Sequence, residues 1–194
     1  MHRFIRIAVA ISLVAVPGAA LAHPGHANVA GFSHGFAHPL GGLDHVLAMV
    51  AVGLYAALLG GRALWALPAA FLVAMATGGA LGAAGIAMPY VEVAIALSVV
   101  VLGLGVAARA SIPTFAATIL VGLFAVFHGH AHGAEMAIEA GGHAYAAGFL
   151  LATALLHGAG LAAGHLTARS APRLAPMAGG AMALAGVALL TMAG

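Results

Sequence analysis

The chain lacks cysteine and lysine, and it carries little charge of either sign. None of its 194 residues is Cys, which excludes disulfides, zinc ribbons and thiolate chemistry. All six basic residues are Arg, so a phosphate-binding loop of the GxxxxGK type is excluded as well. The arginines form no basic patch, and nucleic-acid binding is not expected. Only 5% of the residues are charged, against about a quarter in an average soluble domain.

Apolar residues and glycine take the place of the missing charge. Hydrophobic residues make up 64% of the sequence, and 28 residues are Gly. Small residues let helices approach closely inside a bilayer. The composition therefore predicts an all-α, polytopic membrane protein. Apolar stretches of about 20 residues, the length that crosses the hydrocarbon core, predict helices near 41–60, 64–84, 91–108, 113–131, 143–165 and 174–193.

Residues 1–22 have the features of a secretory signal peptide. A short segment with two arginines precedes the apolar run Ile7–Val16, and Ala20-Leu21-Ala22 offers the small residues of a cleavage site. The predicted domains are therefore a signal peptide over 1–22 and a six-helix transmembrane transporter domain over 23–194. An uncleaved signal anchor is the alternative, and it would place His23 on the same side of the membrane.

The charged residues sort to opposite ends of the predicted helices. Four arginines lie in three alternate connections, and the positive-inside bias makes these loops cytoplasmic. This orientation predicts a protein of the bacterial inner membrane with its mature N-terminus in the periplasm. The acids and most histidines then gather at the outer face and form a mouth that attracts cations. The arginines are Arg62, Arg109, Arg169 and Arg173, and the acids are Asp44, Glu92, Glu135 and Glu139.

Two histidine-acid clusters at the outer helix ends predict the functional site. The first is His38-Pro39-Leu40-Gly41-Gly42-Leu43-Asp44-His45, and the second is His128-Gly129-His130-Ala131-His132-Gly133-Ala134-Glu135. Ionisable groups in such apolar surroundings are expensive and usually functional. Imidazole and carboxylate are ligands that suit Ni(II), Co(II) and Zn(II). We therefore expect the two clusters to meet in one metal site.

Spacing places the candidate ligands on shared helix faces. In the second cluster, residues 128, 132 and 135 follow one another at i, i+4 and i+7. In the first, Pro39 is expected in the first turn of its helix. His38 and His45 then share a face, and Asp44 joins them if the Gly41-Gly42 pair lets the backbone bend. The predicted metal ligands are His38, Asp44, His45, His128, His132 and Glu135, with His23, His26, His34, His130 and His157 as weaker candidates.

Two of the weaker candidates carry alternative interpretations. His130 points away from the shared face and is expected to be solvated. His157 lies in the middle of a predicted span. It either hydrogen-bonds across helices or acts as an inner ligand.

The motifs resemble those of the HupE/UreJ family of membrane proteins. The resemblance is carried by the Gly35–Pro39 run that leads to Asp44-His45 and by Phe127–Glu135, and it covers essentially the whole chain. It implies a permease for Ni(II), or Co(II), associated with hydrogenase and urease gene clusters, whose maturation proteins would receive the metal. It also implies that the six predicted ligands serve metal selection and passage. The metal is then a substrate, and neither a permanently bound cofactor nor an enzymatic activity is expected.

Two other functions remain open from the sequence. One is a membrane metal-binding accessory or sensor protein that does not transport. The other is an intramembrane zinc hydrolase, with three protein ligands and one open position for water.

Overall fold

The computed structural model describes residues 27–136 and 142–193, and these residues form seven α-helices and no strand. The all-α prediction is confirmed for this part of the chain. The helices are α1 (Ala27–Gly41), α2 (Leu43–Leu59), α3 (Ala63–Ala83), α4 (Val91–Ala107), α5 (Thr114–Met136), α6 (Gly142–Ser170) and α7 (Leu174–Met192).

Several of the helices have the length and composition of membrane spans. Four segments, within α3, α5, α6 and α7, are each long and apolar enough to cross a membrane. The pair formed by Gly31–Gly41 and α2 passes as a unit that is bent by 82°, and α4 is a shorter apolar helix of 17 residues. Each of the six predicted segments corresponds to one helix from α2 to α7, and their ends agree within five residues. The number of spans stays a prediction, as does the signal peptide, which lies outside the described residues.

Helix α1 corrects the expected start of the first mature helix. Pro39 lies near the end of α1 rather than in the first turn of α2. The backbone leaves the helix at Gly42, where φ is −99° and ψ is 118°. The prediction missed α1 because glycines and histidines interrupt its apolar pattern. Packing against α6 stabilises it instead, since a Cβ on Gly35 would overlap the Tyr145 carbonyl.

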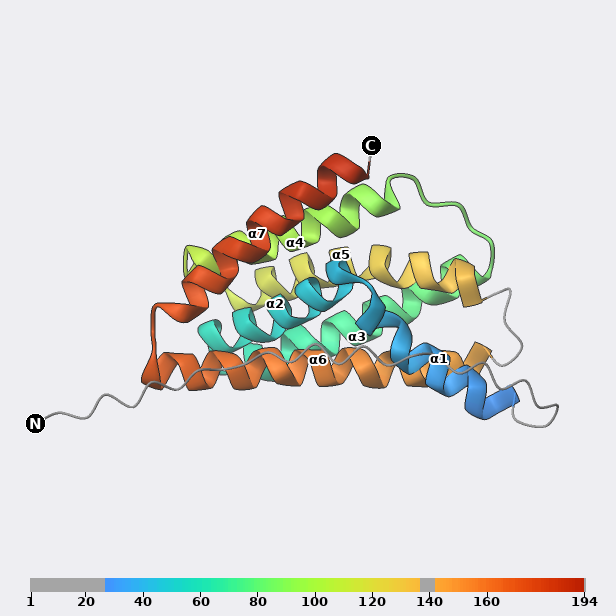
Figure 1. Ribbon diagram of the computed structural model, residues 1–194, viewed down its shortest axis with the longest axis horizontal. Helices are drawn as coiled ribbons and strands as arrows, with labels where there is room; N and C mark the ends of the chain where they lie inside the picture. The colour runs from blue at the N-terminus through green and yellow to red at the C-terminus, as the bar shows by residue number, and fades with distance from the viewer. Residues whose placement is uncertain (1–26, 137–141, 194) are drawn as a thin grey trace, which may run out of the picture.

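Close backbone contacts divide the helices into three packed groups. In Figure 1, α3 lies along α5, α4 lies along α7, and α1 and α2 both pack against the long helix α6. Glycine makes each contact possible. A Cβ on Gly129 would overlap the Met75 carbonyl of α3, one on Gly160 would overlap the Val50 carbonyl of α2, and one on Gly179 would crowd the backbone of α4. Small residues at helix interfaces are typical of packing inside a bilayer.

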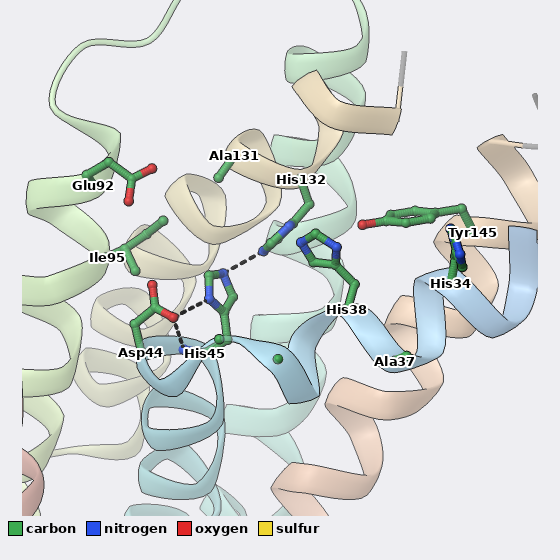
Figure 2. Close-up of a pocket in the computed structure, with 12 residues that line it drawn as sticks. His34, Ala37, His38, Asp44, His45, Glu92, Ile95, Ala131, His132 and Tyr145 are labelled. Carbon is green, nitrogen blue, oxygen red and sulfur yellow. Dashed lines mark hydrogen bonds and ion pairs between the residues drawn. The ribbon is translucent and has the colours of Figure 1, made fainter. Parts of the chain in front are cut away.

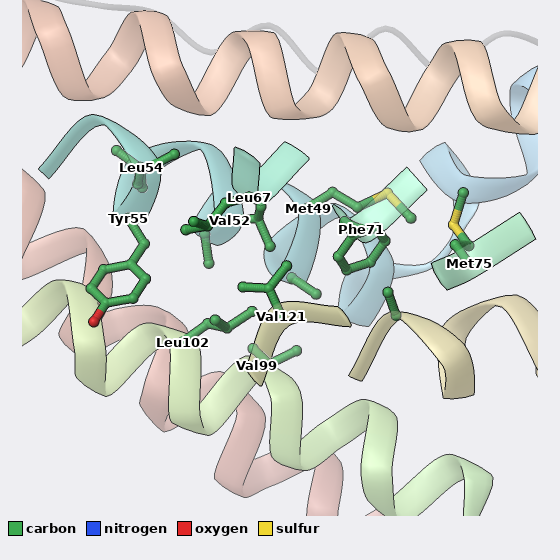
Figure 3. Close-up of a cluster of buried hydrophobic side chains, with 14 of the residues drawn as sticks. Met49, Val52, Leu54, Tyr55, Leu67, Phe71, Met75, Val99, Leu102 and Val121 are labelled. Atoms are coloured by element: carbon green, nitrogen blue, oxygen red, sulfur yellow. The ribbon is translucent and has the colours of Figure 1, made fainter. Parts of the chain in front are cut away.

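Between these groups, large apolar side chains fill the centre of the bundle. Figure 3 shows this core, in which the helices α2 to α5 all contribute. Phe71 of α3, Val99 of α4 and Val121 of α5 are completely buried. The three groups are therefore held together by side chains, whereas each group is held together by backbone contact.

The connections that carry arginine lie together at one end of the bundle, on the left in Figure 1. Tyr55 at this end of α2 donates a hydrogen bond to the Ala110 carbonyl over 3.0 Å, and Arg109 donates to the Pro172 carbonyl. The start of α2, the start of α4 and the end of α5 lie toward the opposite end. The separation of arginines from the two histidine clusters, predicted from the sequence, is confirmed.

The glycine contact between α4 and α7 offers a test of this packing. Gly179→Ala should lower the free energy of unfolding by about 1–3 kcal/mol, because its new methyl group must push the helices apart. Gly180→Ala is the matched control, since nothing lies within 4 Å of a Cβ there. That change should be neutral or slightly stabilising, because Ala is the better helix former. Unfolding measured in detergent, with equal stability of the two variants, would contradict the packing described.

Candidate metal centre

The break at Gly42 places an aspartate and a histidine at the start of α2. Asp44 Oδ1 accepts two hydrogen bonds from His45, one from the backbone N–H and one from ring Nδ1, each 2.8 Å long. A carboxylate in the first turn of a helix satisfies an N–H that has no partner within the helix. The pair thus fixes the imidazole, and the lone pair of His45 lies on Nε2, on the far side of the ring from Asp44.

Position 42 favours glycine because of the side chains around it and not because of its backbone angles. Its φ of −99° is open to any residue. A Cβ at this position, however, would lie 2.7 Å from Asp44 Oδ1 and 3.0 Å from His45 Nδ1. The glycine therefore leaves room for the contact between the carboxylate and the imidazole.

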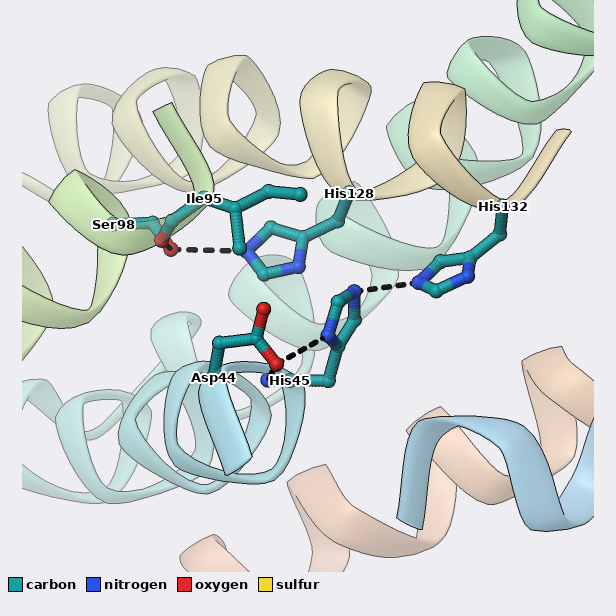
Figure 4. Close-up of polar contacts among 6 residues, drawn as sticks. All are labelled: Asp44, His45, Ile95, Ser98, His128 and His132. Atoms are coloured by element: carbon teal, nitrogen blue, oxygen red, sulfur yellow. Dashed lines mark hydrogen bonds and ion pairs between the residues drawn. The ribbon is translucent and has the colours of Figure 1, made fainter. Parts of the chain in front are cut away.

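The second cluster meets the first across the bundle. His132 Nε2 on α5 lies 2.5 Å from His45 Nε2, as an N–H···N hydrogen bond (Figure 4). The ring centres of His45 and His128 are 4.9 Å apart. The prediction that these two helices touch at the ends that carry the clusters is confirmed.

The glycines of the second motif orient its histidines. Gly129 and Gly133 each follow a histidine by one residue, and both press against the backbone of α3. Adjacent residues on a helix point about 100° apart, so the two glycines and the two histidines lie along neighbouring stripes of α5. Packing the glycine stripe against α3 therefore turns His128 and His132 toward α2. In this motif the glycines therefore pack α5 against α3, and the histidines face the site.

A cavity of about 850 Å³ opens above the histidines, and it is shown in Figure 2. Exposure falls along its depth. His38 is exposed, His45 and His132 are each 7% exposed, and His128 is completely buried. The residues that line the cavity come from α1, α2, α4, α5 and α6: His34, Ala37, His38, Gly41, Gly42, Asp44, His45, Glu92, Ile95, Ala131, His132 and Tyr145.

Two of these cavity residues were missing from the predicted site. Glu92 of α4 faces the same space as Asp44, and Tyr145 of α6 lies beside His38, with ring centres 5.8 Å apart. The signal for Glu92 was available, since it is one of only four acids in the chain. Nothing in the pattern of α6 singled out Tyr145.

Two further aromatic contacts continue inward from the cluster. The ring centre of Phe71 lies 5.6 Å from that of His128 and 5.0 Å from that of His157. His157 is 1% exposed, and neither of its ring nitrogens has a hydrogen-bond partner in the described part of the chain. The alternative in which His157 hydrogen-bonds across helices is therefore wrong for these residues.

Of the remaining predicted ligands, the structure describes the side chains of His34 and His130 and does not describe those of His23, His26 and Glu135. His130 is 8% exposed and its Nε2–H donates to the Ile86 carbonyl over 2.6 Å, so the expectation that it is solvated is wrong. This bond ties the chain beyond α3 to α5. The weaker candidate His34 lines the cavity. His23, His26 and the side chain of Glu135 lie outside the described residues.

As the side chains lie, no three His, Asp or Glu residues in the described ranges are arranged to hold a metal ion. The contact between His45 and His132 gives a physical reason. Two nitrogens bound to one ion lie about 2.0–2.1 Å from it and hence about 3 Å from each other, whereas these two are 2.5 Å apart. The imidazoles must separate before both can bind the same ion.

Comparison with known proteins decides the family. The model of the family described as HupE / UreJ protein matches residues 11–189. The chain belongs to the HupE/UreJ family. Protein HupE of Rhizobium leguminosarum bv. viciae is 50% identical to it over 190 residues, which cover 97% of this chain and 98% of that protein. No solved structure matches the chain. Both clusters lie within the HupE/UreJ match.

The two adjacent glycines at the break test the geometry of this HupE/UreJ site. Gly42→Ala should weaken the binding of Ni(II) about 10-fold, equivalent to about 1.4 kcal/mol, because the methyl group displaces Asp44 or His45. Gly41→Ala should bind as the wild type does, since nothing lies within 4 Å of a Cβ at Gly41. Isothermal titration of the purified proteins in detergent measures both. Equal affinities for the two variants would show that Gly42 does not shape the site.

Proposed function

We propose that the protein is a permease for the uptake of Ni(II), or Co(II), that supplies the maturation of a hydrogenase or urease, and that it is not an enzyme. The observation that carries this proposal is the meeting of two distant histidine clusters beneath a cavity. Membership of the HupE/UreJ family supports it. So does the position of the cavity, which lies at the end of the bundle opposite the arginines.

The first step is capture of the hydrated ion at the cavity. Asp44 and Glu92 line it, and a concave site with charges of one sign raises the local concentration of the opposite ion. With the arginine loops in the cytoplasm, the cavity faces the periplasm across the bacterial inner membrane. The exposed His34 and His38 also line the cavity, so the ion meets their imidazoles before the buried His45 and His132.

The second step exchanges water for nitrogen ligands. His45 and His132 are each 7% exposed and His128 is completely buried, and the chain has no cysteine. Imidazole suits a borderline ion such as Ni(II), Co(II) or Zn(II) better than Mg(II) or Ca(II). The hydrogen bond between His45 and His132 is replaced by bonds to the ion, as their spacing requires.

The third step carries the ion inward past Phe71 to His157. At a rise of about 1.5 Å per residue, His132 and His128 lie about 6 and 12 Å from the end of α5. His157 lies about 22 Å from the start of α6, which is close to the midpoint of this 29-residue helix. A bilayer core about 30 Å thick that is centred on α6 therefore has His157 near its middle. An imidazole without a hydrogen bond at this depth is available for transient binding, and among the weaker candidates in the described ranges only His157 contacts the cluster through Phe71.

Uptake by cells that express single variants tests the proposal directly. His38→Ala and Asp44→Asn should each reduce the initial rate of radioactive Ni(II) uptake at least about 10-fold, because each removes a ligand at the cavity. His157→Ala should reduce the rate without abolishing capture. His165→Ala is the matched control, since this histidine is exposed and bonds only the Leu161 carbonyl. Uptake at the wild-type rate in both His38→Ala and Asp44→Asn would contradict the proposal.

The dependence of transport on pH gives a second test. Only the neutral imidazole binds a metal ion, and an ordinary imidazole takes up a proton near pH 6.5. The rate should therefore fall several-fold as the outer pH drops from 7 to 5. Vesicles with the purified protein, an internal metal-sensitive dye and a clamped membrane potential measure this rate. A constant rate over that range would contradict rate-limiting capture by exposed histidines of the cavity, and no influx at any pH would favour a sensor or accessory protein.

A further inference from the structure

A buried serine of α4 makes a second contact behind the histidine cluster. Ser98 is completely buried, and its Oγ lies 2.6 Å from the Ile95 carbonyl oxygen and 2.9 Å from Nε2 of His128 (Figure 4). A hydroxyl has a single hydrogen to donate. Two oxygens 2.6 Å apart need that hydrogen between them, so Ser98 donates to Ile95. The serine oxygen must then accept its second hydrogen bond from His128.

The protonation of the imidazole follows from this donor count. A neutral histidine that donates from Nε2 carries its lone pair on Nδ1. Nδ1 of His128 is buried and has no hydrogen-bond partner in the described ranges. Figure 4 shows this nitrogen on the side of the ring that faces Asp44 and His45.

We propose that Ser98 is a positioning residue that holds His128 in the tautomer with hydrogen on Nε2, and thereby makes Nδ1 its metal-binding atom. The proposal deepens the proposed function and rests on it for the identity of the ligand. In metal sites, the hydrogen bond made by one ring nitrogen decides which tautomer is present and fixes the orientation of the ring.

The first cluster uses the same device with the nitrogens reversed. Asp44 takes the Nδ1–H of His45 and leaves the lone pair on Nε2, which accepts the hydrogen bond from His132. A serine on α4 and an aspartate on α2 therefore set the two tautomers independently. As a result, the lone pairs of His45 and His128 belong to different ring atoms. Without Ser98, the buried ring of His128 can carry its hydrogen on either nitrogen and can turn in its site.

Nitrogen NMR observes the tautomer without any metal. Protein labelled with 15N-histidine is measured in detergent, and the His128 signals are assigned by their loss in His128→Gln. We expect the Nε2–H form in the wild type and in Ser98→Thr, whose hydroxyl can make the same two bonds. Ser98→Ala should show a mixture of tautomers. The Nδ1–H form in the wild type, or an unchanged spectrum in Ser98→Ala, would overturn the proposal.

Metal titration then connects the tautomer to binding. Ser98→Ala should weaken Ni(II) binding about 10–100-fold, the usual effect of losing a partner behind a metal-binding histidine. Ser98→Thr should restore the affinity to within a few-fold. Ser170→Ala is the matched control, because Ser170 bonds a carbonyl of its own helix in the same way but is exposed at the arginine end. Its affinity should equal that of the wild type.

The two measurements separate this proposal from the proposed function. A changed tautomer in Ser98→Ala with unchanged Ni(II) affinity would overturn the positioning role while leaving the permease proposal intact. A wild-type protein that binds no Ni(II) but shows the Nε2–H tautomer would contradict the proposed function. In that case the role of Ser98 would be reduced to a structural hydrogen bond, and the metal-binding part of the inference would be overturned with it.

Discussion

The interruption of the helix at Gly42 is the constraint on which the site depends. A straight helix would place His38 and His45 on a single face and leave Asp44 about 100° around the helix from His45. With the bend of 82°, α1 and α2 both pack against α6, α2 also contacts α3 and α4, and the start of α2 lines the cavity. Irregular backbone at membrane depth is tolerated only where it lines a cavity or is buried in protein. The break and the cavity therefore require each other, and Asp44 satisfies part of the backbone that the break exposes.

Glycine contacts convert this local break into a fixed arrangement. In a bilayer, helices gain little from burying apolar surface against one another, so close van der Waals packing must hold them. Gly129 and Gly133 bring α5 onto α3 backbone to backbone, which leaves the neighbouring histidines only one direction to face. A substitution at these glycines would thus act on metal binding through the rotation of α5, although neither residue offers a side chain to a ligand.

The sequence was sufficient to locate the helices and to predict that the two clusters meet. Apolar runs and i, i+4 spacing are patterns of residues close together in the chain, and the positions of the arginines assign the helix ends to opposite sides of the membrane. It could not give α1, because packing against Tyr145 rather than an apolar pattern stabilises that helix. Ser98 was missed because its partner, His128, lies 30 residues away and is joined to it only by the packing of α4 against α5. Tyr145 was missed for the same reason, since a cavity wall depends on how separate helices are placed. Glu92 was predicted in the cation-attracting mouth by its charge, but it was not among the predicted ligands. The prediction that His130 is solvated failed because its hydrogen-bond partner, the Ile86 carbonyl, lies in the connection between α3 and α4, far from His130 in the sequence.

The site lies where three separately packed groups of helices meet. His38, Asp44 and His45 belong to the group around α6, the histidines of α5 to the pair with α3, and Glu92 and Ser98 to the pair of α4 with α7. Within each group the contacts are made by backbone and are stiff. Between the groups they are made by side chains such as Phe71 and Val99. His45 and His132 belong to different groups. Separating their imidazoles to the spacing that one ion requires would therefore change contacts between groups rather than the fold of any one of them.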